Sequence, residues 1–281
     1  MLDMIIRCGG IEKTTFVFFD TGLEYAATKE HIGYLEGKYG IQVVKIQPDK
    51  SIPMACRKYG VPFLSKYASE MIYRLQKHGF LFEDKPFEVL MQEFHNCKTA
   101  LIWWCDVKKE NSNPQFVISR TPYLKEFMVH NPPQFRISDK CCQYAKKAPA
   151  HNFEKSGGFD LCCTGIRRSE GGARAIGYKD CFSGNTDGAD QFRPIFWFKN
   201  ADKEEYCNHY NVQHSKCYTD YGLSRTGCFG CPFGRDFETE LLTIKTHEPK
   251  LYKAANVLFG ESYEYTRAFL DFRKEMRRIN G

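Results

Sequence analysis

The sequence predicts an α/β protein built on a parallel sheet with helices on both faces. "TTFVFFDTGLEY" (14–25) starts as an apolar, β-rich run, which indicates a buried strand that opens into a loop. "AATKEHIGYLEGKYG" (26–40) has helical composition, and "IQVVKIQP" (41–48) has the composition of a second strand that stops at Pro48. Strand, helix and strand in this order predict a parallel βαβ unit.

The rest of the chain continues this alternation. Residues 51–79 are expected to be helical in two pieces, broken at Gly60 and Pro62, and residues 86–105 to form another helix. "FDLCCTGIRR" (159–168) predicts a strand that runs into a glycine-containing loop, and "NADKEEYCNHYN" (200–211) predicts a capped helix. We expect a main domain over residues 1–237 and a C-terminal helical cap over residues 238–281.

Composition and charge narrow the class of protein. Hydrophobic residues make up 42% and charged residues 26% of the 281, which is typical of a soluble globular chain. No apolar run approaches the roughly 20 residues needed to span a bilayer, and no secretory signal begins the chain. These features exclude a membrane protein and predict a cytoplasmic one. The net charge of +6 suits an anionic ligand such as a nucleotide and also permits nucleic acid.

Thirteen cysteines are many for a cytoplasmic chain, in which disulfides are rare. Metal or cluster ligation, redox chemistry or burial must account for them. For the six cysteines that are scattered singly we expect small, buried apolar residues: Cys8, Cys56, Cys97, Cys105, Cys207 and Cys217.

The segment "SRTGCFGCPFG" (224–234) carries half of a possible metal site, Cys228 and Cys231. The spacing occurs in zinc sites, redox motifs and iron–sulfur proteins. A thioredoxin-type redox role is disfavoured because no evident helix follows directly. Two thiolates do not close a four-coordinate site, so a second pair of cysteines is needed.

Two adjacent pairs are available for that role, Cys141–Cys142 and Cys162–Cys163. The second pair lies in a predicted strand, where neighbouring side chains point to opposite faces and could hardly reach one metal centre. The first pair precedes a helix-like stretch, where neighbours diverge by only about 100°. A multi-iron cluster accepts such neighbours more easily than one zinc ion does. The pattern favours a [4Fe-4S] cluster, with zinc as the alternative, on Cys141, Cys142, Cys228 and Cys231.

Six segments along about residues 1–235 together resemble the phosphoadenosine phosphosulfate (PAPS) reductase family of the adenine-nucleotide alpha-hydrolase superfamily. They occur in the family's order, and the tandem-cysteine and Cys-x-x-Cys segments are similar to those of its cluster-bearing branch. The segments are "FVFFDTGLEY", "YGVPFLSKYAS", "KCCQYAKKAP", "GIRRSEGGAR", "RPIFWFKNADKEEY" and "YGLSRTGCFGCP".

The resemblance implies a site for ATP, PAPS or adenosine phosphosulfate at the carboxyl ends of the parallel strands, beside the cluster. Glycine in the Asp-Thr-Gly loop lets backbone groups approach an adenine, and arginine forks suit phosphate or sulfate oxygens. A glutamate can orient an arginine or bind a ribose hydroxyl. The nucleotide-binding residues implied in this way are Asp20, Thr21, Gly22, Lys66, Gly165, Arg167, Glu170, Arg174 and Arg225.

Two departures from the family bear on activity. The chain begins at "MLDMIIRCGGIEK", which looks like the helix that follows the family's Ser-Gly-Gly-Lys-Asp-Ser phosphate loop. Either the start is missing or the member is degenerate, and we expect weak or absent nucleotide turnover. In addition, the last cysteine is Cys231, so the family's C-terminal nucleophile has no counterpart. Cys162 and Cys163 could offer a nucleophile, but a buried strand is the preferred interpretation, and the catalytic residue stays unknown.

Three functions follow from these expectations. The leading one is an oxidoreductase or transferase of sulfur metabolism that cleaves or reduces an adenine nucleotide or sulfonucleotide with a thiol reductant. The second is a component of DNA phosphorothioation or another sulfur modification of nucleic acid, with a cysteine desulfurase as partner. The third is a catalytically degenerate binding module that a metal stabilises.

Overall fold

The computed structural model describes residues 1–107, 116–171, 177–186, 188–234 and 236–280. The chain divides into two compact units, and each unit is assembled from three separate segments. Unit 1 comprises Met1–Asp20, Ala26–Pro48 and Lys146–Arg225, and unit 2 comprises Thr21–Tyr25, Asp49–Ala145 and Thr226–Gly281. The C-terminal residues that were expected to form a separate cap therefore group with Asp49–Ala145.

The predicted βαβ unit is confirmed in unit 1. Strand β1 (Phe16–Phe19) pairs in parallel with β2 (Val43–Ile46), and α2 (Ala26–Tyr39) connects them. The amide of Asp20 donates to the Ile46 carbonyl at 2.9 Å, so the parallel pairing extends to the residue at which the first loop begins. Apolar strands on either side of one helix produce this arrangement because a parallel connection needs a crossover.

A second, separate sheet in unit 1 has the strand order β3-β5-β4, formed by Leu161–Cys163, Asp190–Phe192 and Phe182–Ser183. Strands β3 and β5 are parallel and β4 is antiparallel. The described residues form a mixed, mainly helical α/β structure and do not show one central parallel sheet flanked by helices. The strands are only two to four residues long, so little of each is available for pairing.

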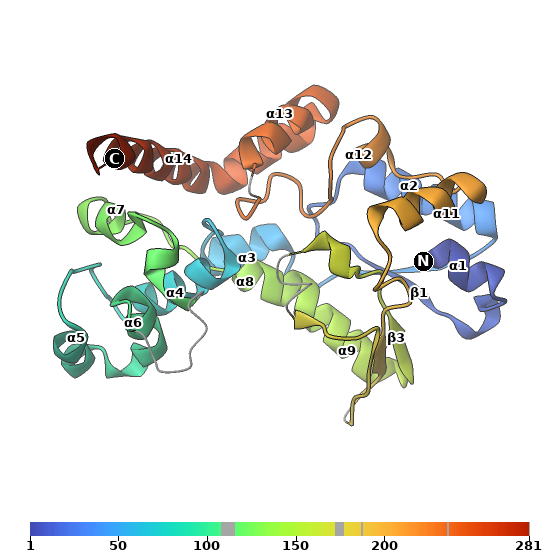
Figure 1. Cartoon of the computed structure of the whole chain (residues 1–281), viewed down its shortest axis with the longest axis horizontal. Coiled ribbons are helices and arrows are strands. Elements are labelled where there is room, and N and C mark those ends of the chain that lie inside the picture. Colours follow the sequence, from blue (N-terminus) through green and yellow to red (C-terminus); the bar gives the residue numbers. More distant parts are fainter. Residues whose placement is uncertain (108–115, 172–176, 187, 235, 281) are drawn as a thin grey trace. The chain divides into compact units, whose positions relative to one another are not determined.

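Unit 1 also contains further α-helices (Figure 1). The predicted capped helix is confirmed as α11, where the Asp202 carboxylate accepts a hydrogen bond from the amide of Lys199 at 2.8 Å. These include α1 (Leu2–Arg7), α9 (Ala148–Gly157), α11 (Asn200–His209) and α12 (Lys216–Thr219).

Unit 2 begins with the two helical pieces that the sequence predicts, α3 (Ile52–Tyr59) and α4 (Lys66–Lys77). The interruption at Gly60 and Pro62 is also as expected. Ser65 caps α4, because its hydroxyl accepts a hydrogen bond from the amide of Ala68 at 3.2 Å.

The expected helix over 86–105 is divided into α5 (Phe87–Glu93), a 3-10 turn (His95–Cys97) and α6 (Lys98–Trp104). The break falls at Phe94, whose backbone leaves the helical region at φ −116° and ψ 41°. Its ring instead meets the Phe80 ring edge-on, with centroids 5.3 Å apart. Burial of an aromatic ring thus overrides the helical propensity of the segment.

Helices α7 (Leu124–His130) and α14 (Pro249–Asn280) of unit 2 pack with α4 and α6 around one apolar core. The core contains Trp104 and Phe269, both fully buried, and joins residues from α4, α6, α7 and α14. In Figure 1 the long α14 is drawn in red, and α7 and α14 are in contact. Unit 2 also contains α8 (Lys140–Cys142) and α13 (Phe237–His247). A membrane crossing would need a longer apolar helix than any among the described residues.

Candidate functional site

The first thiol pair lies at the beginning of a helical stretch in unit 2. Cys141 and Cys142 form the first turn of α8, which continues into a π-helical turn over Gln143–Lys147. The hydroxyl of Ser138 accepts a hydrogen bond from the amide of Lys140 at 3.0 Å and so holds the start of this helix. Both thiols are buried. The helical setting predicted for this pair is confirmed.

The second thiol pair lies on a loop that other segments of unit 2 hold in place. The amide of Phe229 donates to the Leu23 carbonyl at 3.0 Å. Gly230 has φ +60°, and its carbonyl accepts a hydrogen bond from the buried hydroxyl of Tyr263 on α14. The positions of Cys228 and Cys231 are therefore set by the chain near residue 23 and by the C-terminal helix.

Thr21 connects this loop to the residues that the resemblance implied for nucleotide binding. It is only 2% exposed, and its hydroxyl donates to the Glu24 carboxylate at 2.6 Å. The same oxygen lies 3.8 Å from the sulfur of Cys228. The structure thus places the Thr21 side chain in contact with the thiol loop rather than on an open surface.

Side chains from distant parts of the sequence meet at Cys141. Its thiol is hydrogen-bonded with Cys142 and with Cys56 of α3, and it interacts electrostatically with Cys231. The hydrogen bond with Cys142 lowers the pKa of Cys141, but the bond with Cys56 and burial outweigh it, so the pKa is raised. Sequence reasoning missed Cys56, because a single cysteine on a helix carries no spacing signal. We call Cys56, Cys141, Cys142, Cys228 and Cys231 the thiol site.

The thiol site supplies soft donors in a largely buried setting. Across the described residues, no three or more His, Cys, Asp or Glu side chains are arranged to hold a metal ion. Four of the five cysteines are buried and Cys231 is partly exposed. Thiolates are the ligands that iron–sulfur clusters and zinc prefer, so the residue types suit either group although their arrangement in the described part of the chain does not form a metal site.

Arg167 and Glu170 are the two implied nucleotide-binding residues that the structure brings together, in unit 1. The Glu170 carboxylate accepts from the amide of Arg167 at 3.3 Å, and its oxygen lies 3.8 Å from the Arg167 Nε. The guanidinium also donates to the Asn200 side chain at 3.0 Å. Glu170 thus lies beside the arginine, and its expected role of orienting an arginine stays a prediction.

The other implied residues have separate local settings. Asp20 forms an ion pair with Lys29 at 2.8 Å in unit 1, whereas Gly22 has φ +84° in unit 2 and leaves no room for a bulky side chain beside Ser51. Lys66 is an exposed residue at the start of α4, and Gly165 and Arg225 are exposed loop residues of unit 1. Arg174 lies outside the described residues.

A cavity of about 260 Å³ within unit 1 includes Arg167 in its wall. Burial lowers the pKa of both His31 and His214, so these imidazoles are neutral at pH 7. The sequence analysis did not identify the residues that line this cavity from the helix at 26–39. His31, Leu35 and Tyr39 recur there at the four-residue spacing of one helical face. The charged and polar side chains around the cavity are Asp3, His31, Tyr39, Arg167, Lys203, Tyr206 and His214.

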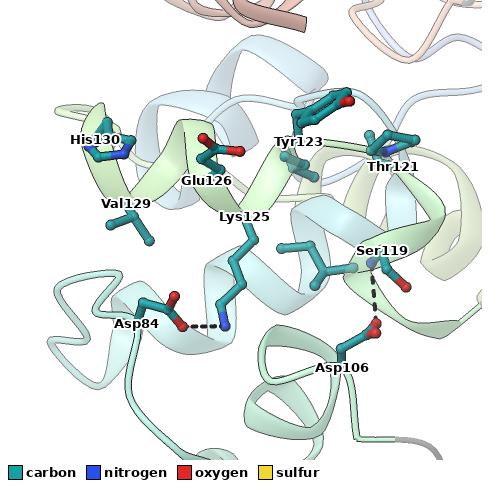
Figure 2. A pocket seen from close by; sticks show the side chains of 12 residues that line it. Asp84, Asp106, Ser119, Thr121, Tyr123, Lys125, Glu126, Val129 and His130 are labelled. Atoms are coloured by element: carbon teal, nitrogen blue, oxygen red, sulfur yellow. Dashed lines mark hydrogen bonds and ion pairs between the residues drawn. The ribbon is translucent and has the colours of Figure 1, made fainter. Parts of the chain in front are cut away.

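A larger cavity of about 480 Å³ lies in unit 2 and contains none of the implied site residues (Figure 2). Lys125 points across it to Asp84, with 2.5 Å between the amine and the carboxylate. The Asp106 carboxylate accepts from the amide of Ser119 at 3.3 Å. The cation of this cavity, Lys125, is already paired with Asp84, so we do not assign the cavity an anionic ligand.

Cys162 and Cys163 in β3 are partly exposed rather than fully buried. Burial and a hydrogen bond with Glu154 raise the pKa of Cys162 to about 12, and burial also raises the pKa of Cys163. The reactive form of cysteine is the thiolate, which is scarce at neutral pH when the pKa is raised. This environment disfavours a nucleophilic role for the pair.

A basic and aromatic surface lies on α3, the π-helical turn at Gln143–Lys147 and the segment before α3 in unit 2. Tyr59 and Tyr144 are stacked with their ring centroids 4.9 Å apart and an interplanar angle of 12°. Lys50 lies over Tyr144 and Lys58 over Tyr59, at 4.8 Å and 5.5 Å from the ring centroids. Neither lysine forms an ion pair within the described chain. We call these four residues the lysine–tyrosine surface.

Comparison with known proteins does not identify a family for this chain. No family model matches the chain, and no curated protein matches it at a significant level. The thiol site, the Arg167 cavity and the lysine–tyrosine surface are therefore the features from which we argue the function.

Proposed function

We propose that the chain is a PAPS-reductase-like protein of sulfur metabolism that binds an adenine nucleotide or sulfonucleotide and holds a [4Fe-4S] cluster. Zinc is the alternative metal, and the cytoplasm is the proposed location. The proposed arrangement of unit 1 is the family's parallel sheet with helices on both faces. The parallel β1–β2 pair with α2 between its strands supports that arrangement.

One observation carries the metal proposal, namely that the Cys141 thiol is hydrogen-bonded with Cys142 and interacts electrostatically with Cys231. Residues 141 and 231 lie on separate segments of the sequence, so their proximity is a property of the folded chain and not of local spacing. Isolated buried thiols have no reason to gather in one place, whereas four thiolates are what a cluster or a zinc ion requires.

Cys141, Cys142, Cys228 and Cys231 would hold the metal group. A bound cluster would supply a structural link between α8 and the loop at 228–231. Thr21 would help to fix this loop, since its hydroxyl contacts Cys228. Outer hydrogen bonds of this kind orient metal ligands in many proteins.

Arg167 supports the nucleotide part of the proposal. Arg167 lines a cavity in which Lys203 is a second cation, Asp3 is a carboxylate and burial lowers the pKa of both histidines. An arginine that Glu170 and Asn200 hold in position can present its forked donors to a phosphate or sulfate group. The cavity is small, so it suits one part of a nucleotide, such as the phosphate groups.

Metal analysis of the full chain tests the cluster. We expect anaerobically purified protein to contain about four iron and four sulfide per chain with broad absorption near 400 nm, as expected for a [4Fe-4S] cluster. Cys141→Ser and Cys231→Ser should each lose most of the iron, whereas Cys97→Ser, a buried cysteine of unit 2 outside the thiol site, should keep it. Stoichiometric zinc in place of iron would support the alternative metal. Protein without either metal would refute the proposal.

Calorimetric titration with ATP and with PAPS tests the nucleotide part. We expect binding by the wild type and an affinity at least tenfold lower for Arg167→Ala, because a charged donor to phosphate contributes about 1.5–3 kcal/mol. Lys66→Ala removes an exposed cation that does not line the Arg167 cavity. The affinity of this variant for the nucleotide shows whether Lys66 also contacts the ligand. Wild-type protein that binds neither nucleotide would leave the degenerate, metal-stabilised module as the better description.

The lysine–tyrosine surface favours a second candidate, a component that modifies nucleic acid with sulfur. Cations without carboxylate partners attract phosphates, and aromatic rings next to them can stack on bases of a single strand. We expect Lys50→Ala combined with Lys58→Ala to weaken binding of a fluorescent single-stranded DNA and to reduce its salt dependence. Anisotropy at several salt concentrations measures both effects, and Lys29→Ala combined with Lys45→Ala in unit 1 is a matched loss of two cations. Equal binding by all variants would remove this candidate.

A further inference from the structure

Trp197 is the exposed tryptophan of the chain. Of the three tryptophans, Trp103 and Trp104 are buried in the core of unit 2, whereas Trp197 in unit 1 is 54% exposed. Tryptophan side chains are highly buried on average, because the indole ring is large and mostly apolar. An indole that stays in contact with solvent offers a flat surface that a planar ligand can cover.

A cation lies against this ring. The Arg168 guanidinium lies over Trp197, 5.6 Å from the ring centroid. Arg168 is exposed, and it forms no ion pair with a carboxylate of the described chain. Nucleobases stack on aromatic rings and on guanidinium planes, and the positive charge attracts the phosphates that accompany the base. We call Arg168 and Trp197 the indole platform.

Hydrogen bonds between two loops fix the indole platform. The amide of Arg168 donates to the Phe196 carbonyl at 2.8 Å. The hydroxyl of Ser169 donates to the Phe198 carbonyl at 2.9 Å. The residues on both sides of Trp197 are thus tied to the loop that carries the arginine, so the ring and the cation are held together before a ligand binds.

The indole platform adjoins the Arg167 cavity. Ile195 and Phe198, which flank Trp197 in the sequence, both line that cavity, and Arg168 directly follows Arg167. Neither platform residue lines the cavity itself, so both side chains lie outside its wall. The cavity has a volume of about 260 Å³, whereas sites that enclose a drug-sized ligand have roughly 300–1,000 Å³. A nucleotide whose phosphates occupy this cavity must therefore keep its base outside it.

We propose that the indole platform is the base-binding part of the nucleotide site, where the adenine stacks on Trp197 beside Arg168 while the phosphates reach the Arg167 cavity. This inference rests on the proposed function. It assigns the adenine to a different place from the loop at 20–22, which the resemblance implied for it. Stacking recognises the flat face of a base and not its hydrogen-bonding edge, so guanine should be accepted as well as adenine.

Calorimetry on the full chain compares ATP with inorganic triphosphate, which has the phosphates but no base. We expect Trp197→Ala to bind ATP at least about fivefold more weakly than the wild type does and to bind triphosphate equally well, because only ATP loses a stacking contact. Trp197→Phe keeps an aromatic ring and should retain most of the ATP affinity. Arg167→Ala should lose affinity for both ligands. Phe182→Ala, which removes an exposed ring of unit 1 that does not line the cavity, should keep both affinities.

Tryptophan fluorescence reports the contact directly. In the wild type, ATP should quench part of the emission and protect the exposed indole from acrylamide, whereas triphosphate should do neither. Trp197→Phe retains only the two buried tryptophans, so ATP should leave its emission unchanged. If Trp197→Ala does not fold, the fluorescence of the wild type decides, since bound ATP that gives Trp197 no protection would contradict stacking.

Three results overturn this inference alone and leave nucleotide binding in place. Equal ATP affinity of Trp197→Ala and the wild type would show that the base lies elsewhere. Equal losses for ATP and triphosphate in Trp197→Ala would mean that the ring supports the cavity wall and holds no base. Calorimetric binding of ATP to the wild type with no change in its emission would exclude the contact. Wild-type protein that binds neither ATP nor triphosphate would instead remove the proposed function, and this inference with it.

Discussion

Gly230 offers a sharp test of how the loop at 228–231 is held. Its backbone has φ +60°, a left-handed conformation that costs an L-residue about 1–2 kcal/mol. A Cβ atom added there would lie 2.7 Å from the Tyr263 hydroxyl and 2.9 Å from the Cβ of Ala255. Ala255 and Tyr263 are both buried on α14, so neither can move without shifting the helix.

We expect Gly230→Ala to lower the free energy of unfolding by about 2–5 kcal/mol. The backbone accounts for about 1–2 kcal/mol of this, and overpacking against α14 adds about 1–3 kcal/mol. A loss of this size is a large part of the total stability of a typical domain. The variant should also bind less iron, because relief of the contact moves Cys231 away from Cys141.

Gly79→Ala is the matched control for the backbone contribution. Gly79 lies in the same unit with φ +74°, and an added Cβ would have no atom within 4 Å. This variant should therefore lose only about 1–2 kcal/mol and keep its iron. Urea denaturation of both variants, followed by circular dichroism, measures the difference. Equal losses for the two glycines would refute the close packing of the loop against α14.

Three other substitutions test the described interactions. Trp104→Ala empties a fully buried site among the rings of Phe80 and Phe82, and urea denaturation should show a loss of about 3–5 kcal/mol; a loss below 1 kcal/mol would contradict the core. Burial opposes a low pKa for Asp3, but hydrogen bonds from Tyr206, Tyr39 and Arg7 outweigh it and hold the pKa below the ordinary value. The ionised Asp3 therefore stabilises the fold above about pH 4, and this stabilisation is lost as the pH falls through the folded-state pKa. Asp3→Asn should have a lower free energy of unfolding than the wild type at pH 6, and the difference should shrink toward pH 3. A difference that does not change with pH would contradict the lowered pKa of Asp3. Glu154→Gln removes the carboxylate that raises the pKa of Cys162, so iodoacetamide should alkylate Cys162 faster in the variant at pH 8. Peptide mass spectrometry measures the rate, and an unchanged rate would show that Glu154 does not control the pKa of this thiol.

Part of the candidate site could be predicted from the sequence. The residue types and spacing of "GCFGC" and "KCC" indicated thiol ligands, and helical composition after residue 142 correctly set the first pair on a helix. The pairing of Arg167 with Glu170 follows from their three-residue separation in one turn. Each of these features depends on residues close together in the chain, where local geometry is restricted enough to be inferred.

The sequence by itself determined the short-range features of this protein: the β1–α2–β2 connection, the breaks at Gly60 and Pro62, and the capped start of α11. Only the tertiary structure decided that Cys56 joins Cys141, that Thr21 turns toward Cys228, and that the strands form two small sheets rather than one. Backbone propensity and periodicity act over a few residues, whereas these contacts depend on the path of the whole chain and on which apolar surfaces it buries.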